Sequence, residues 1–112
     1  MTTLMPTDSN DNAIPALRLK QGGAHHIGAS SASARNTTAF ADDTKIVSLY
    51  ATVPVFVKFG GSTVTAANTD HYFPAGLYYD IALGGEQAAH YTHMAVLRAG
   101  TTDGDVYLSE KE

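Results

Sequence analysis

Short runs of alternating apolar and polar residues, with no helical period, run along most of this chain. In residues 45–52, three apolar side chains share one face of the expected strand: Val47, Leu49 and Ala51. Residues 55–59 repeat the alternation after Pro54, which cannot donate to a strand ladder and so marks a break or an edge. In this second run Lys58 identifies the solvent-exposed face, and Val57 identifies the face that packs in the core.

Turn signals divide the first part of the chain. A strand over residues 14–19 is expected to turn at Gly22-Gly23 into a second strand over residues 25–33. Residues 30–40 are rich in small hydroxyl side chains, which bond nearby backbone groups and favour irregular structure. This segment is expected to cross an end of the sheet, and the Phe40 side chain is expected to fill the space beneath it.

The second part continues in the same way. Four more strands are expected: residues 70–73, 77–83, 91–99 and 105–109. Pro74 and Gly76 turn the chain between the first two, as in a bent hairpin or a corner between two sheets. Asp103-Gly104 favours a final hairpin between the last two. Residues 63–68 fit either a short strand or a loop.

The fold class follows from this spacing. Seven or eight short antiparallel strands, about ten residues apart, predict an all-β protein with a single small β-sandwich or jelly-roll-like domain. Residues 13–112 are assigned to that domain. Residues 1–12 lack apolar periodicity and are predicted to be a flexible tail, which could also order against a neighbouring copy if copies assemble.

Composition narrows the function classes. The net charge is −4 with only 7 Lys and Arg, which argues against a nucleic-acid partner, because phosphate binding needs clustered cations. The chain has no cysteine, so disulfides, thiolate nucleophiles and zinc-thiolate sites are excluded. We find neither a secretory signal nor an apolar run of the roughly 18 residues that a membrane span needs. The protein is expected to be made in the cytoplasm, with no membrane partner.

Five histidines are the candidates for catalysis or metal binding. Neighbours such as His25 and His26 point to opposite faces of a strand, and His90 and His93 do so if both lie on one strand. A metal site could combine these side chains: His71, His90 and Asp70 or Asp80. Surface or half-buried histidines are the favoured interpretation. Ser62, His71 and Asp70 lack a nucleophile elbow, so we predict no enzyme and no cofactor.

Aromatic residues gather around the Pro74 turn. They are Tyr72, Phe73, Tyr78 and Tyr79. Strand alternation requires Tyr78 and Tyr79 to face opposite sides, so one should be in the core and the other exposed or at an interface. The four residues form the candidate contact surface, because aromatic side chains often anchor protein interfaces. Cross-strand packing is the competing explanation for the exposed ring.

The order of parts over residues 46–110 also carries a resemblance. A strand ending in Ala51-Thr52 leads to one ending in Phe59-Gly60, a Thr-rich link over residues 63–69, the turn Phe73-Pro74-Ala75-Gly76 and a terminal Ser109-Glu110. This order resembles a family of small all-β structural or accessory proteins of tailed phages and prophages. The resemblance implies a virion structural or assembly role without catalysis, as a capsid decoration, neck or tail accessory subunit.

Such a protein would act through contacts with other virion proteins or with copies of itself as a homo-oligomer, and would end up in the virion. His25, His26, His90 and His93 match no motif of that family, and the first third of the chain aligns with nothing in it. A carbohydrate- or small-ligand-binding β-sandwich module is the alternative, suggested by Tyr72, Tyr78 and Tyr79. A metal-assisted enzyme using the histidines is the third hypothesis.

Overall fold

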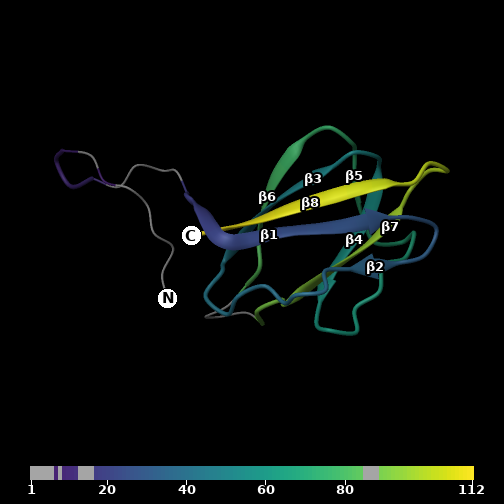
Figure 1. The fold of residues 1–112 in the computed structure, drawn as a ribbon, viewed down its shortest axis with the longest axis horizontal. Coiled ribbons are helices and arrows are strands. Elements are labelled where there is room, and N and C mark those ends of the chain that lie inside the picture. Colours follow the sequence, from purple (N-terminus) through teal and green to yellow (C-terminus); the bar gives the residue numbers. More distant parts are fainter. Residues whose placement is uncertain (1–6, 8, 13–16, 85–88) are drawn as a thin grey trace.

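The described residues include two four-stranded antiparallel sheets (Figure 1). The computed structural model describes Thr7 and residues 9–12, 17–84 and 89–112. The described residues contain eight strands and no helix. The strands are β1 (Leu19–Ala29), β2 (Ala34–Arg35), β3 (Ile46–Ala51), β4 (Val55–Gly60), β5 (His71–Phe73), β6 (Tyr78–Ala82), β7 (His93–Arg98) and β8 (Gly104–Lys111). The predicted all-β class is confirmed.

One sheet has the order β1-β8-β3-β6 and the other β2-β7-β4-β5. The strand pairs are nested along the chain, from the first with the last to the two in the middle: β1 with β8, β2 with β7, β3 with β6 and β4 with β5. Only the β4–β5 connection stays within one sheet. Pro54 lies between β3 and β4, and Pro74 between β5 and β6, so each proline marks a passage from one sheet to the other.

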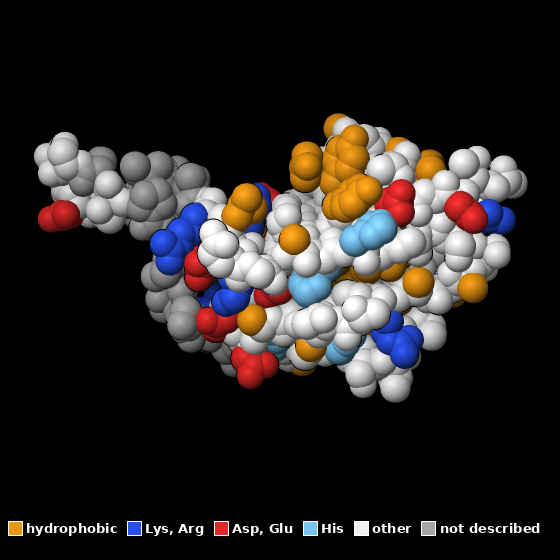
Figure 2. All heavy atoms as spheres, viewed as in Figure 1, with side chains coloured by type: hydrophobic (Ala, Val, Ile, Leu, Met, Phe, Trp, Pro, Cys, Tyr) orange, Lys and Arg blue, Asp and Glu red, His pale blue; other side chains and the backbone are white. Residues whose placement is uncertain are grey.

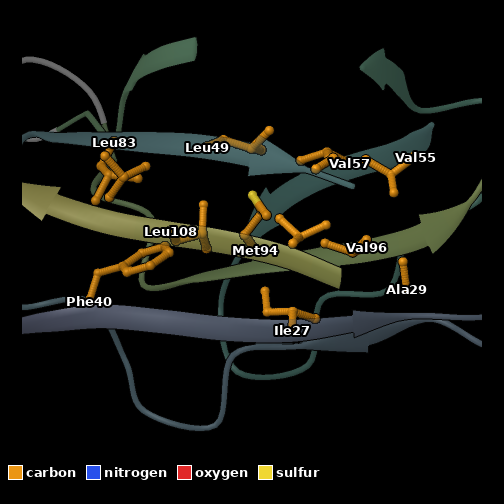
Figure 3. Close-up of a cluster of buried hydrophobic side chains, with 13 residues drawn as sticks. Ile27, Ala29, Phe40, Leu49, Val55, Val57, Leu83, Met94, Val96 and Leu108 are labelled. Atoms are coloured by element: carbon orange, nitrogen blue, oxygen red, sulfur yellow. The ribbon is translucent and has the colours of Figure 1, made fainter. Parts of the chain in front are cut away.

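The inner faces of the two sheets form the core between them (Figure 3). The predicted faces of β3 and β4 are confirmed, because Val47, Leu49 and Val57 are fully buried while Lys58 is exposed. Phe40, from the segment between β2 and β3, is also buried and points into the end of the core, as predicted. Burial of apolar surface at these positions is the main force that holds the sheets together.

The predicted turn at Gly22-Gly23 is wrong. The chain runs through both glycines as one 11-residue strand, β1, whose pairing with β8 shifts register between Leu19 and Ala24. Two glycines can produce either a turn or an irregularity within a strand, and here Gly22 takes the positive φ of 73° where the register of β1 with β8 shifts. Gly23 lies against Glu110, where a Cβ would come within 2.8 Å of that residue's Cβ.

Gly23→Ala should therefore destabilise the domain by about 1–3 kcal/mol, because the added methyl has no room beside Glu110. Gly28→Ala on the same strand is the matched control, since a Cβ there meets nothing within 4 Å. Urea unfolding of both variants measures the difference. Equal stabilities would show that the β1 irregularity adapts freely.

The predicted final hairpin is also wrong. β7 and β8 belong to different sheets, so the turn at 101–104 leads the chain from one sheet to the other and the two strands do not pair. Each end is bonded to the β3–β4 passage: Ala99 N donates to Pro54 O at 2.9 Å, and Thr52 N donates to Asp105 O at 2.9 Å. Asp-Gly promotes a tight turn, but the partners of the flanking strands are set by these distant contacts.

Two further expectations have mixed outcomes. Residues 63–68, which fitted a strand or a loop, contain no strand. None of the eight strands includes residue 7 or residues 9–12 of the predicted tail. The rest of the tail, and residues 14–16 of the predicted first strand, lie outside the described residues.

Candidate functional site

Four aromatic side chains lie in register across the outer face of the β1-β8-β3-β6 sheet. His26 of β1 is opposite Tyr107 of β8, Tyr107 is opposite Tyr50 of β3, and Tyr50 is opposite Tyr78 of β6. One residue comes from each strand, so the row spans the whole sheet. We call these four residues the aromatic row.

The rings of the aromatic row pack on one another in two pairs. His26 and Tyr107 are stacked, with ring centroids 4.9 Å apart and planes 12° apart. Tyr50 and Tyr78 have centroids 4.8 Å apart and planes tilted by 42°. The row is also solvated: Tyr78 is 74% exposed and Tyr107 47%. Such a large exposed aromatic surface is the kind of feature that marks an interaction site.

Small side chains flank the aromatic row on both sides along the strands. On one side the register aligns Ala24, Ser109 and Ser48. On the other side Gly28 is opposite Asp105. The rings therefore form a ridge above a low surface, and Figure 2 shows hydrophobic side chains gathered beside a histidine on this part of the molecule.

A histidine–aspartate hydrogen bond and a lysine–aspartate ion pair border the ridge. His26 Nε2 donates to Asp105 Oδ1 at 2.7 Å, and both side chains are about half exposed. Lys111 Nζ donates to Asp80 Oδ1 at 2.9 Å. These carboxylates add polar groups at the edges of an aromatic centre, which is the usual anatomy of a protein interface.

The structure places the four predicted contact residues on three different surfaces. Tyr78 belongs to the aromatic row, whereas Tyr72 lies on the outer face of the other sheet and packs on Phe56. Phe73 and Tyr79 are half-buried and pack on each other between the sheets, with ring centroids 5.0 Å apart. The predicted division of Tyr78 and Tyr79 is confirmed, with Tyr78 exposed. The four residues do not share one face.

The prediction from sequence missed three members of the aromatic row: His26, Tyr50 and Tyr107. Alternation within β3 did place Tyr50 on the face opposite Leu49. It could not show that Tyr50 lies between Tyr107 and Tyr78, because that depends on the pairing of strands far apart in the chain.

Comparisons with known proteins leave the function to be argued from these side chains. No protein-family model, no curated protein and no solved structure matches this chain. In the described residues, no helix is long and apolar enough to cross a membrane.

A buried histidine–glutamate pair lies on the opposite face of the same strands. His25 Nε2 donates to Glu110 Oε2 at 2.7 Å, and the two side chains are 7% and 4% exposed. Glu110 Oε1 accepts two more hydrogen bonds, from Thr44 Oγ1 at 2.5 Å and from Ala41 N at 2.9 Å. The pair ties β1 and β8 to the segment between β2 and β3. We call Glu110 and its three donors the carboxylate cluster.

The carboxylate cluster favours the charged form of Glu110. Burial would raise the pKa of this carboxyl, but hydrogen bonds from Thr44, His25 and Ala41 N outweigh it and hold the pKa below its ordinary value of 4.5. Sequence alternation with Val106 and Leu108 already puts Glu110 on the inner face. That signal predicts a buried carboxylate in need of partners.

A depressed pKa gives the stability a defined dependence on pH. The contribution of ionised Glu110 is present above pH 4.5, the value for an unperturbed group, and is lost as pH falls through the lower pKa of the folded state. The stability difference between the wild type and Glu110→Gln should thus shrink from neutral pH to about pH 3. Urea unfolding across that range measures it, and a constant difference would contradict it.

Part of the acid sensitivity should remain in the Glu110→Gln variant. A hydrogen bond from Lys20 lowers the pKa of the Asp43 carboxyl as well, so Asp43 contributes stability in the same direction. Asp43→Asn in the Glu110→Gln background should remove a further part of the slope.

The candidate metal ligands are dispersed. His90 Nε2 donates to Thr44 O at 2.6 Å, and Asp80 is bonded to Lys111. Asp70 and His71 remain together in the lining of a cleft of about 420 Å³, to which Phe59, Phe73, Ile81 and Tyr91 also contribute. Within the part of the chain that the structure describes, no three His, Asp or Glu side chains are grouped closely enough to hold a metal ion.

Proposed function

We propose that this protein is a structural or assembly subunit of a phage or prophage particle, such as a capsid decoration, neck or tail accessory protein, and acts through protein–protein contacts. The observation that carries the proposal is the aromatic row, four rings in register across the outer face of one sheet, with Tyr78 and Tyr107 exposed. Exposed aromatic residues with polar neighbours suit a protein partner. The proposal includes no catalytic step.

The strand order supports the same proposed function. From the orders β1-β8-β3-β6 and β2-β7-β4-β5 we infer a jelly roll, an architecture that viral capsid proteins and lectins both use. A fold of this kind does not by itself select a function. It is consistent with the resemblance to small phage structural proteins over residues 46–110.

The ring geometry favours a protein partner over a sugar. A sugar stacks on an open aromatic face, whereas the faces of His26 and Tyr107 lie against each other at 12°. Tyr50 and Tyr78 also contact each other, although their planes are tilted by 42°. These contacts reduce the ring face that is open to a sugar, whereas the ring edges and hydroxyl groups suit packing and hydrogen bonding with side chains.

Particle composition tests the proposal. The double variant Tyr78→Ser, Tyr107→Ser should enter purified particles in far fewer copies than the wild type, measured by quantitative mass spectrometry. Tyr91→Ser is the control, since Tyr91 is an exposed tyrosine that lines the cleft instead of the ridge. Absence of the wild-type protein from particles would refute the virion role.

A small-ligand-binding module is the second candidate, and the cleft between the sheets favours it. Its volume of about 420 Å³ and its aromatic lining from Phe59, Phe73 and Tyr91 are in the range of ligand sites. A glycan array and a thermal-shift screen of apolar ligands test this function. A response that Phe59→Ser abolishes would support it, and no response in either assay would remove it.

A further inference from the structure

The outer face of the β2-β7-β4-β5 sheet carries a second apolar row. Leu97 of β7 is opposite Phe56 of β4, and Phe56 is opposite Tyr72 of β5. The rings of Phe56 and Tyr72 are in contact, with centroids 5.8 Å apart, and Tyr72 is 56% exposed. We call these three residues the apolar row. Each sheet thus presents an aromatic surface outward, on opposite sides of the sandwich.

The charges near the two rows are opposite in sign. None of the four strands of this sheet contains an aspartate or glutamate, and Lys58 of β4 and Arg35 of β2 both pair in register with Ala95 of β7. The strands of the other sheet contain three carboxylates and two lysines, Lys20 and Lys111. Its outer face carries Asp80 and Asp105, exposed at 60% and 44%, and Lys111, which is bonded to Asp80. The outer face with Lys58 and Arg35 is therefore positive, and we call it the basic face, while the outer face with the aromatic row keeps a small excess of negative charge, and we call it the acidic face.

We propose that the aromatic row of one copy packs against the apolar row of a second copy. This contact brings Asp80 and Asp105 of the first copy toward Lys58 and Arg35 of the second, and it covers exposed rings on both. Contact between two aromatic rows would instead bring like-charged carboxylates together, which disfavours it. The inference rests on the proposed function and names the partner as another copy of this chain.

A contact between two different faces does not close on itself. Each copy in a pair still has one free aromatic row and one free apolar row, so a third copy can add in the same way. Repeated addition gives a ring if the rotation between copies closes and a filament if it does not. A ring of small subunits is an arrangement that a particle accessory protein can use.

Complementary variants test this geometry. Variant A carries Tyr78→Ser and Tyr107→Ser, which leave only the basic face intact. Variant B carries Lys58→Glu and Tyr72→Ser, which leave only the acidic face intact. Sedimentation and light scattering should show each variant alone as a monomer and their mixture as a 1:1 dimer that grows no further. The wild type should form larger species, and Tyr91→Ser, with both faces intact, should behave like the wild type.

Salt gives an independent readout. Wild-type association should weaken between low and physiological salt, because exposed charges more than about 10 Å apart are screened at 0.1 M. Thermal melting of A and B first establishes that both are folded. Association that does not change with salt would show that the charged residues do not determine which face binds the second copy.

Two results would overturn the inference. A wild-type protein that stays monomeric at about 1 mM has no self-contact tighter than that concentration. Self-association of variant B alone would show that two aromatic rows pair with each other. If the protein is monomeric but occurs in particles, this inference is overturned and the proposed function stands. If the protein self-associates but is absent from particles, the proposed function is overturned and the contact between copies stands.

Discussion

Val57→Asp is expected to abolish cooperative folding of the domain. Val57 is fully buried in β4, between β5 and β7, and faces the inner side of the other sheet. An aspartate there would bury an unpaired carboxylate, at a cost of several kcal/mol. That cost is comparable with the roughly 5–15 kcal/mol that stabilises a whole domain. Loss of the thermal transition in circular dichroism is the measurement, and Leu49→Asp should behave in the same way.

The adjacent residue provides the control for Val57. Lys58 follows it on the same strand, is exposed and points outward. Lys58→Ala should change the stability by less than about 0.5 kcal/mol. A Val57→Asp protein that melts at the wild-type temperature would mean that the inner and outer faces of β4 are exchanged.

Glu110→Ala is expected to be the second most damaging change, with a loss of about 2–4 kcal/mol. The substitution removes the acceptor for three donors at once: His25 Nε2, Thr44 Oγ1 and Ala41 N. These groups are too buried to recover their lost hydrogen bonds easily from water. Urea unfolding at neutral pH measures the loss.

A second histidine–carboxylate pair on the same two strands serves as the control. His26 and Asp105 have the same 2.7 Å separation as His25 and Glu110, but they lie on the solvated face. Asp105→Ala should therefore cost less than about 1 kcal/mol. Equal losses for the two substitutions would show that burial does not decide the strength of these pairs.

The chain's local patterns predicted which way side chains point more reliably than which strands meet. Alternation placed Leu49 and Val57 in the core and Lys58 in solvent, because those positions depend only on the two-residue period of a strand. The errors at Gly22-Gly23 and Asp103-Gly104 concern pairing. Each dipeptide is compatible with a hairpin, and contacts from Glu110 and from the β3–β4 passage decide otherwise.

The candidate site was predictable to the same extent. Tyr78 was identified because it stands next to a recognisable turn. Tyr50, Tyr107 and His26 become neighbours only through three strand pairings, one of which joins β1 to β8. A single sequence contains no local signal for such a row. Glu110 could have been found, since it continues the inward series of Val106 and Leu108.

The position of β8 between β1 and β3 has a consequence for the order of folding. Among the eight described strands β1 is made first, yet the strand it pairs with in the sheet, β8, is made last. Until β8 has been made, β1 and the adjoining edge of β3 have no strand to pair with. Such long-range pairing makes folding slow and leaves unpaired strand edges open to aggregation. Completion of the β1-β8-β3-β6 sheet therefore has to wait until nearly all of the described chain has been made.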